Sequence, residues 1–471
     1  MDKTFTAEQN LGTAPVGKLL LHYSVPCVVS MVVNALYNMV DQIFVGQGVG
    51  YLGNAATSII FPITVVAIAL ALWIGDGSAA YFNLKLGEGK EDEARKCVGS
   101  AVSFGIIVSI AVTIVLVAAL KPLVYLFGCT DSIYTYAMEY GAVIAAGTVF
   151  NMVGIVLISL IRADGSPRYA MIAQLTGCVI NFVLDPLFIF VFHWGCAGAA
   201  WATILGQIAT FLIAVFYIPK FKSVKLHRSD YRVDISMCRK FMPLGISSFI
   251  TQIAVVVVCA VTNNLLNLYG ASSKYGSDIA LAVFGIVMKV QQLLISAVAG
   301  IAAGAQPIIG YNFGAGQHGR VKEALRLVNI SATVLAVAAF VAFQLFPVRI
   351  ISIFGSEGAL YNEFAEMSFR IFLMAVMLDG FTIAAAIFQQ AIGHPGKSAA
   401  ITLCRQIVFL IPAELILSAI FGLAGVLAAG AVGDVLAFLF ALYIIRHETK
   451  QLAKFEAETL VSSPAISSLS R

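Results

Sequence analysis

Long apolar stretches separated by short polar segments run along almost the whole chain. They are continuously apolar, without the strict alternation of a half-buried strand, and each is at least about 20 residues long. A helix of that length crosses a hydrocarbon layer about 30 Å thick. The predicted helices span 18–45, 54–84, 96–120, 132–161, 169–192, 196–218, 239–268, 278–311, 322–346, 361–391, 397–420 and 423–445. The pattern predicts an all-α polytopic membrane protein with 12 transmembrane helices, and it argues against a β-barrel.

The composition agrees with this interpretation. Apolar residues make up 60% of the chain and charged residues 11%, whereas a soluble domain carries about 25% charged residues. The segment before Val16 is polar, so we expect no cleavable signal peptide. The eight cysteines are scattered singly, without a C-x-x-C motif. We therefore expect neither disulfides nor a cysteine-based metal site, and no cofactor.

The placement of the basic residues predicts the orientation of the helices. If both termini are cytoplasmic, the cytoplasmic segments hold 23 of the 29 Lys and Arg residues, because six lie elsewhere (29 − 6 = 23). The six are Lys121, Lys274 and Arg349 in external loops and Lys289, Arg370 and Arg405 within helices. This asymmetry follows the positive-inside rule and favours an even number of helices.

The same charges mark a boundary between two halves of the chain. We expect a cytoplasmic N-terminal segment (1–17), an N-lobe (18–218), a basic cytoplasmic linker (219–238), a C-lobe (239–446) and a cytoplasmic C-terminal tail (447–471). The connection 219–240 carries seven basic side chains. Such a cluster also suits an anionic lipid surface or a nucleic acid. We interpret it as a topology anchor and expect no nucleic-acid partner.

The second half of the chain repeats landmarks of the first. At offsets of 227 or 228, the matched positions are Gly77 with Gly304, Gly87 with Gly314, Gly89 with Gly316, Gly165 with Gly393, Pro167 with Pro395, and Gly195 with Gly422. Pro26 matches Pro243 at an offset of 217. Six helices per half bring both halves into the membrane from the same side. The repeats are therefore parallel, two six-helix bundles related by a pseudo-two-fold axis along the membrane normal.

An acid lies inside the first apolar stretch. A carboxylate near the middle of a transmembrane helix costs about 2.5–3.5 kcal/mol on insertion scales, so we interpret Asp41 as functional rather than as a packing accident. Four polar residues at i, i+3, i+4 and i+7 share one helical face: Asn34, Tyr37, Asn38 and Asp41. A polar stripe that ends in an acid predicts the lining of a cavity.

A second acid occurs in the fifth predicted helix, within N-F-V-L-D-P. Asn181 and Asp185 are four residues apart and share a face, and Pro186 is expected to kink the helix beside the acid. Asn151 and Thr203 are candidates to complete the shell, although Asn and Thr also commonly bridge helices. Oxygen ligands suit protons or Na⁺ rather than zinc or copper. The only metal ion we allow for is Na⁺, at Asp41, Asn181 and Asp185.

The remaining intramembrane polar residues are candidates for a substrate cavity. They are Asn34, Asn38, Asp76, Gln252, Lys289, Gln292, Asp379 and Glu414. Asp76 lies near the cytoplasmic end of its helix, where capping or pairing is an alternative role. We hypothesise an ion pair between Lys289 and Asp379, since pairing lowers the cost of burying either charge. The seventh predicted helix has Val258 at the position that corresponds to Asp41.

Five of these stretches together resemble the multidrug and toxic compound extrusion (MATE) family, in particular its MepA-like bacterial branch. The resemblance covers 18–446 and rests on Y-N-M-V-D-Q-I-F-V-G, G-E-G-K-E-D-E-A, R-A-D-G-S-P, N-F-V-L-D-P-L-F-I-F and A-G-A-Q-P-I-I-G-Y-N-F-G-A-G. It implies a two-lobe antiporter that exports organic cations in exchange for H⁺ or Na⁺. It also implies a cation site at Asp41, Asn181 and Asp185, with Tyr37, Asn151 and Thr203 as neighbours. Members with an acid in the seventh helix differ from this chain, where Gln252 is the comparable polar residue.

The expected function is therefore secondary active transport and not an enzymatic reaction. We expect cation-coupled export of lipophilic organic cations by rocker-switch alternating access, with H⁺ favoured over Na⁺ because the site is compact and acid-paired. The protein is expected to be a monomer surrounded by membrane lipids in the bacterial inner (plasma) membrane. The alternative is a lipid-linked precursor flippase of related architecture, which would favour a cavity rich in Arg and Lys. The chain contains neither H-E-x-x-H nor G-x-x-x-x-G-K-[ST], the motifs typical of a metalloprotease and of an ATP-driven pump.

Overall fold

The computed structural model describes residues 11–127, 129–352 and 358–462, and within these ranges the chain forms helices joined by short turns. The first half contains α2 (Val16–Gly48), α3 (Tyr51–Gly87), α4 (Glu91–Leu126), α5 (Asp131–Ala163), α6 (Pro167–Pro186), η1 (Leu187–Val191) and α7 (Gly195–Val215). The connection contains η2 (Ile218–Lys220) and η3 (Arg228–Tyr231). The second half contains α8 (Ile235–Ala271), α9 (Gly276–Gly314), α10 (His318–Leu345), α11 (Pro347–Ser352), α12 (Ala359–Phe372), η4 (Val376–Leu378), α13 (Asp379–Ala391), α14 (Pro395–Leu403), η5 (Cys404–Leu410), α15 (Ile411–Phe421) and α16 (Leu423–Ser462).

Eleven spans in the described part of the chain are long and apolar enough to cross a membrane, and one bent pair brings the number to 12. The bent pair is α12 with α13. The chain bends by 42° between them, whereas a continuous helix over 361–391 was predicted. The path from α14 to α15 is also irregular, because the π-helical η5 separates them. The last helix continues to Ser462, beyond the predicted end at residue 445. The all-α membrane class is confirmed.

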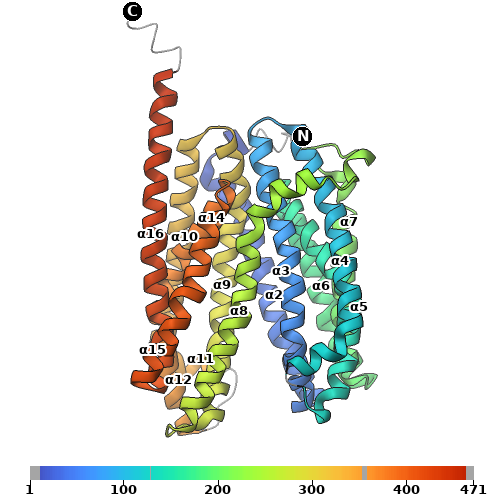
Figure 1. The fold of residues 1–471 in the computed structure, drawn as a ribbon, viewed down its shortest axis with the longest axis vertical. Helices are drawn as coiled ribbons and strands as arrows, with labels where there is room; N and C mark the ends of the chain where they lie inside the picture. The colour runs from blue at the N-terminus through green and yellow to red at the C-terminus, as the bar shows by residue number, and fades with distance from the viewer. Residues whose placement is uncertain (1–10, 128, 353–357, 463–471) are drawn as a thin grey trace, which may run out of the picture.

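The helices form two bundles, an N-lobe of α2–α7 and a C-lobe of α8–α16 (Figure 1). Equivalent turns of the two lobes contain a glycine with nearly the same positive φ. The pairs are Gly50 (87°) with Gly276 (77°), Gly89 (72°) with Gly316 (69°), Gly165 (81°) with Gly393 (82°), and Gly195 (57°) with Gly422 (59°). L-residues rarely adopt this conformation, so the glycines are required there. The internal repeat is therefore preserved down to the backbone of its turns.

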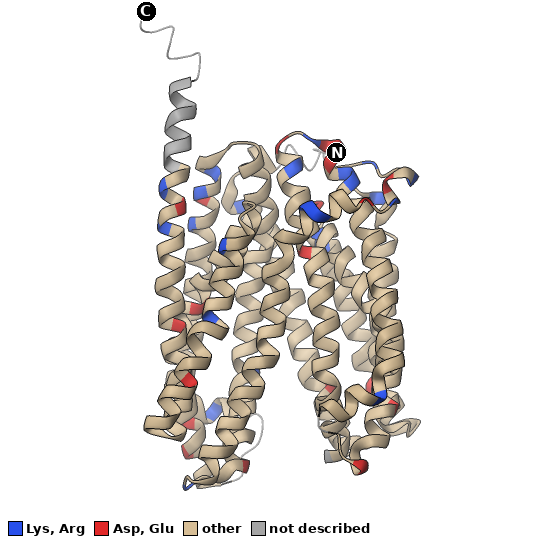
Figure 2. Cartoon of the chain, in the orientation of Figure 1, with Lys and Arg blue, Asp and Glu red and all other residues tan. Residues whose placement is uncertain are grey.

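One end of the molecule carries most of the basic side chains, at the top of Figure 2. We call it the basic end; the turns α3–α4, α5–α6, α9–α10 and α13–α14 and the 216–234 connection lie there. The connection is anchored by the buried carboxylate of Asp164. This carboxylate accepts hydrogen bonds from the Tyr217 hydroxyl (2.7 Å) and from the N–H groups of Lys222 (2.8 Å) and Ser223 (2.9 Å). Burial raises the pKa of Asp164, although these hydrogen bonds act in the opposite direction.

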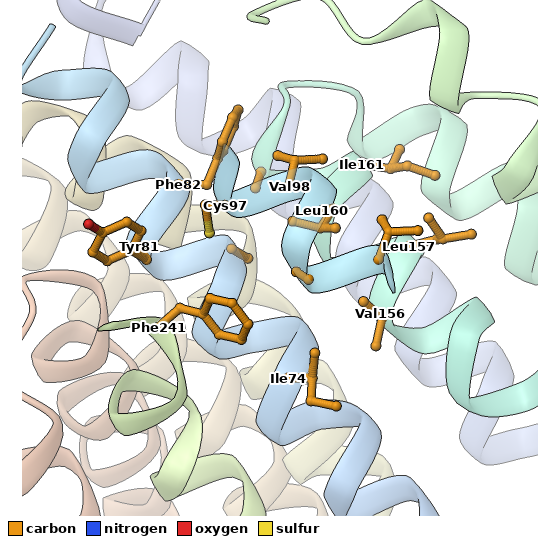
Figure 3. Packing of buried hydrophobic residues seen from close by; sticks show 14 of the residues in the cluster. Ile74, Tyr81, Phe82, Cys97, Val98, Val156, Leu157, Leu160, Ile161 and Phe241 are labelled. Atoms are coloured by element: carbon orange, nitrogen blue, oxygen red, sulfur yellow. The ribbon is translucent and has the colours of Figure 1, made fainter. Parts of the chain in front are cut away.

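The two lobes meet closely at the basic end, through glycines that the repeat relates. A Cβ atom at Gly77 of α3 would lie 2.6 Å from the carbonyl oxygen of Phe241 on α8. A Cβ atom at the equivalent Gly304 of α9 would lie 2.5 Å from the Cα atom of Ser24 on α2. Phe241 crosses from the C-lobe into the largest apolar cluster of the N-lobe, among side chains of α3, α4 and α5 (Figure 3). The lobes are thus packed together at this end without a gap.

The two bundles diverge towards the opposite end, which we call the far end (Figure 1). On the basic-end side of α2, the Ser24 hydroxyl donates a hydrogen bond to the carbonyl oxygen of Ile301 on α9 (2.9 Å). Nearer the far end, Asn34 and Asn38 of α2 and Lys289 of α9 are exposed. The facing helices are therefore in contact at one end and accessible at the other.

Candidate functional site

The two acids of the N-lobe come together near the far end. Asp41 of α2 is 9% exposed and Asp185 of α6 is 1% exposed. Their carboxyl groups are within hydrogen-bonding reach of each other. Oδ1 of Asp41 is buried without a hydrogen-bond partner, and no Lys, Arg or His forms an ion pair with either acid among the described residues. The pair is therefore enclosed and has no basic counter-charge.

An amide and a hydroxyl complete the shell around Asp185. In the orientation that satisfies both ends of its amide, Asn181 donates to Oδ2 of Asp185 at 3.0 Å. Its carbonyl oxygen accepts hydrogen bonds from the backbone N–H (3.1 Å) and the hydroxyl (3.3 Å) of Thr203 on α7. Three helices of the N-lobe thus converge on the acid pair. Asn181 and Thr203, which were predicted to surround the acids, lie beside Asp185 in the structure.

Two tyrosines approach the acid pair from different helices. The side chains of Tyr37 on α2 and Tyr140 on α5 lie within electrostatic range of both carboxyl groups. Tyr37 was predicted from the sequence and Tyr140 was not, because no spacing within α5 relates it to the acids on α2 and α6. On the far-end side of Asp41, the ring of Phe44 packs 5.9 Å from Phe182 and 6.3 Å from Phe190. Phe182 and Phe190 are 51% and 39% exposed, so these rings lie at the surface of the lobe beside the acid pair.

The polar stripe of α2 has different surroundings along its length. Asn38 donates a hydrogen bond to the carbonyl oxygen of Asn34 (2.7 Å), and both side chains are exposed. Asp41 lies on the same face but is covered by α6 and η1. Asn151 of α5 is half-buried and lies eleven residues from Tyr140, which corresponds to about 16 Å along a helix. That separation places Asn151 nearer the basic end than the acid pair.

The C-lobe acids are arranged differently. Arg405, carried by the π-helical η5, donates a hydrogen bond to Asp379 at 2.7 Å and to Asp434 of α16 at 3.2 Å. Asp379 and Asp434 are 1% and 7% exposed. The hypothesised pair of Lys289 with Asp379 is wrong, because Arg405 takes that place. Lys289 is exposed on α9, and in the described part of the chain no acid lies within ion-pair distance of it.

The other cavity candidates divide between the lobe surfaces and the interior. Gln292 is exposed one turn from Lys289 and donates to the Ser296 hydroxyl at 3.4 Å. Gln252 of α8 is half-buried. Glu414 of α15 is fully buried and accepts a hydrogen bond from the Thr262 hydroxyl of α8 at 2.6 Å.

Asp76 lies in the contact between the lobes rather than near the acid pair. Its carboxylate accepts hydrogen bonds from Ser159 of the same lobe and from Ser248 of α8, each at 2.9 Å. Arg162 lies 3.7 Å away and supplies a counter-charge. Beside this contact, the indole of Trp73 donates to the carbonyl oxygen of Met242 at 2.8 Å. Asp76 is therefore paired with groups of both lobes, and pairing was the alternative that its position in the sequence had left open.

Comparison with known proteins identifies the family. A family model described as MatE matches residues 26–187 and 248–416, which together are well over half of the chain. The chain belongs to the MATE family. Members of this family are transporters and not enzymes. The two matched segments fall on the two lobes, as expected for a fold built from a repeat.

Individual members of the MATE family resemble the chain over nearly its whole length. The multidrug export protein MepA of Staphylococcus aureus (strain MRSA252) is 25% identical over 433 residues, which cover 92% of this chain and 94% of that protein. MepA of Staphylococcus saprophyticus is 25% identical over 451 residues, covering 94% and 97%. A solved structure described as the outward-facing conformation of a multidrug resistance MATE family transporter has a TM-score of 0.89 at 24% identity, covering 96% of this chain and all of that one. MATE in complex with MaD3S has a TM-score of 0.88 at 24% identity, with the same coverage. The two-lobe MATE fold is therefore shared.

Proposed function

We propose that this MATE-family transporter exports lipophilic organic cations in exchange for protons, as a monomer in the bacterial plasma membrane. The family and the multidrug export proteins among its relatives support export of small molecules. The choice of the proton as coupling ion rests on the acid pair of Asp41 and Asp185. It is buried, lacks a basic counter-charge, and has its two carboxyl groups within hydrogen-bonding reach.

Two carboxyl groups this close exchange a proton readily. Two negative charges in one buried site repel each other strongly, so the pair holds at least one proton when it is enclosed. A proton between two carboxyl oxygens needs no further ligand. Sodium needs several oxygens around it, and here Asn181 adds one amide to the two acids. Sodium is the second candidate and is tested beside the proton.

The charge distribution supports an orientation for the export cycle. With the basic end in the cytoplasm, the positive-inside rule is obeyed and both chain termini are cytoplasmic. The close lobe contact at Gly77 and Gly304 then closes the cytoplasmic side, and the diverging far end faces outwards. This arrangement corresponds to the outward-facing step of a rocker-switch cycle, in which one lobe rocks against the other.

In this cycle, protons entering from outside neutralise Asp41 and Asp185. Neutralisation removes the electrostatic attraction for a bound cation, which leaves from the far end. The lobes then rock, the basic end opens, and the protons pass to the cytoplasm, which restores the charge that attracts the next cation. A membrane potential contributes about 2.3 kcal/mol per charge per 100 mV, enough to sustain roughly a fiftyfold gradient.

The alternative flippase function is less well supported by the side chains between the lobes. A pyrophosphate ligand would require several free basic groups. Arg405 is bound to Asp379 and Asp434, and Arg370 pairs with Glu366 at 2.7 Å. Among the three intramembrane cations that the sequence offered, this leaves Lys289. The aromatic and acidic lining of the N-lobe instead suits a lipophilic cation, through charge and cation–π contacts.

The test is ethidium efflux from proteoliposomes under a proton gradient alone or a Na⁺ gradient alone. We expect efflux under the proton gradient and its loss in Asp41→Asn at equal reconstitution. The matched control is Glu363→Gln, which removes an exposed acid paired with Lys274 near the far end. Efflux under a Na⁺ gradient only would replace the proton by Na⁺. Efflux under neither gradient, with movement of a labelled polyprenyl lipid instead, would establish the flippase.

A further inference from the structure

A second carboxyl group without a counter-charge is buried in the C-lobe. Glu414 is fully buried, and its Oε1 atom accepts the hydrogen bond from Thr262. Its Oε2 atom is buried without a hydrogen-bond partner. No Lys, Arg or His of the described chain forms an ion pair with it. An ionised carboxylate with one hydrogen bond in this place would be very costly, whereas the protonated acid is neutral and avoids the cost of burying a charge.

The elements that pack around Glu414 offer no compensating charge. From α8 come the Thr262 hydroxyl and the thiol of Cys259, which lies within electrostatic range. Arg405 comes from η5 and Asp434 from α16, but Arg405 is already paired with Asp434 and with Asp379. No neighbouring charged group is therefore free to balance an ionised Glu414.

The position of Glu414 parallels that of the N-lobe acid pair. Glu414 precedes Phe421, the last residue of α15, by seven residues, and Asp41 precedes Gly48, the last residue of α2, by seven. Both acids therefore lie about 10 Å from the far end of their helices. Asp185 meets α2, the first helix of the N-lobe, and Glu414 meets α8, the first helix of the C-lobe. At the repeat offset of 227 or 228, Glu414 corresponds to Leu187 or Pro186 and so lies within two residues of the position of Asp185.

The backbone before Glu414 departs from regular α-helix. The π-helical η5 ends at Leu410, and Pro412 lies two residues further on, so backbone hydrogen bonds of this turn are displaced or absent. Such a break allows α15 to move against α8 within the C-lobe. Separation of the two helices would expose the acid to water.

We infer that Glu414 is a second proton-exchange group, so that each lobe carries one proton-binding site. This rests on the proposed proton coupling at Asp41 and Asp185. The step is a simple dissociation: the Glu414 carboxyl group gives its proton to water when α15 separates from α8, and regains one when it is enclosed again. The transporter would then exchange more protons per substrate than the N-lobe pair alone provides.

The test is proton release on addition of ethidium to the purified, detergent-solubilised protein in weak buffer with a pH indicator. We compare the wild type, Glu414→Gln, Asp41→Asn, the double variant, and Glu363→Gln as control. We expect Glu414→Gln to lose about half of the wild-type release, Asp41→Asn to lose the remainder, and the double variant to release none. Wild-type release in Glu414→Gln would overturn the second site while leaving the proposed function intact. No release from the wild type would overturn both.

A second variant keeps the inference testable if Glu414→Gln does not fold. Thr262→Val retains the acid and removes its hydrogen-bond donor. We expect the infrared band of a protonated carboxyl group to shift in frequency, and the pH at which ethidium releases the C-lobe proton to change. An infrared spectrum and a release profile identical to those of the wild type would contradict a proton on Glu414.

Discussion

The N-lobe and the C-lobe share a backbone plan but balance their buried charges in opposite ways. In the N-lobe, Asp41 and Asp185 face each other with an amide and a hydroxyl nearby and no base. In the C-lobe, Asp379 and Asp434 hold Arg405 between them at 2.7 and 3.2 Å. The turns of the two lobes nevertheless match in conformation at four pairs of glycines. The repeat therefore fixes where helices lie and leaves the chemistry of each lobe free.

The difference shows what a buried acid requires in order to exchange protons. A guanidinium beside a carboxylate favours the charged form of that carboxylate, because the ion pair lowers the cost of burying either charge. A carboxylate beside a second carboxylate gains and loses a proton at much lower cost. By this criterion the N-lobe pair is suited to proton exchange. The group of Asp379, Arg405 and Asp434, which we call the C-lobe triad, is suited to a structural role.

The largest expected effect comes from removing one acid of the N-lobe pair. Asp185→Asn should abolish proton-driven ethidium efflux, to the level of protein-free liposomes, and leave the protein folded. The matched change in the C-lobe, Asp379→Asn, should retain proton-driven efflux, because Arg405 keeps Asp434 as a partner. Equal loss of coupling in both variants, at equal reconstitution, would contradict the division between the lobes.

The basic end should respond alike in both lobes, because the repeat relates its contacts. Gly77→Ala and Gly304→Ala each place a methyl group against backbone atoms of the other lobe. Both should prevent closure of the basic end and reduce transport at least about tenfold, since backbone cannot yield as a side chain does. Gly285→Ala on α9 is the control, with nothing within 4 Å of its Cβ position.

Distances between spin labels on the α3–α4 and α9–α10 turns would measure this closure. We expect longer distances in Gly77→Ala and Gly304→Ala than in the wild type and in Gly285→Ala. Unchanged distances together with normal transport would show that the close glycine contacts are dispensable.

The C-lobe triad should be more important for stability than for coupling. Arg405→Leu leaves two buried acids without a cation and should cost about 3–5 kcal/mol of stability, read as a lower midpoint of thermal unfolding in detergent. The combined variant of Arg405→Leu with Asp379→Asn and Asp434→Asn should recover most of the loss. Arg370→Leu, which breaks an exposed pair with Glu366, should cost about 0–1 kcal/mol. A small effect of Arg405→Leu would mean that the acids are already protonated.

Much of this architecture could be predicted from the sequence, because a membrane leaves few choices. The length and continuity of the apolar stretches gave the spans, and helical spacing placed Asn181 and Asp185 on one face. The bend between α12 and α13 has no comparable sequence mark, since residues 371–378 are all apolar and include no proline. The spacing of polar residues describes one helix at a time. It therefore predicts which residues share a face of that helix, but not which other helix packs against that face.

The errors in the predicted site follow from that limit. Arg405 reaches Asp379 because η5 and α13 pack in the same lobe, and a spacing rule within one helix does not contain that information. Tyr140 was missed for the same reason, since its relation to Asp41 depends on how α5 packs against α6 and α7. Asp76 was recognised as an unusual acid, but its partner Ser248 lies on the other lobe.

The smallest expected effect separates two residues that the sequence treated as equivalent neighbours of the acid pair. Thr203→Val removes the hydroxyl that donates to Asn181, and a hydrogen bond worth about 0.5–1.5 kcal/mol corresponds to a roughly two- to tenfold change. We expect the proton concentration for half-maximal efflux to shift by that factor, and Thr203→Ser to restore it. Asn151→Ala should leave it unchanged, because Asn151 lies about 16 Å along α5 from Tyr140. An equally large shift in Asn151→Ala and in Thr203→Val would contradict this distinction. It would mean that the proton site extends from the acid pair towards the basic end.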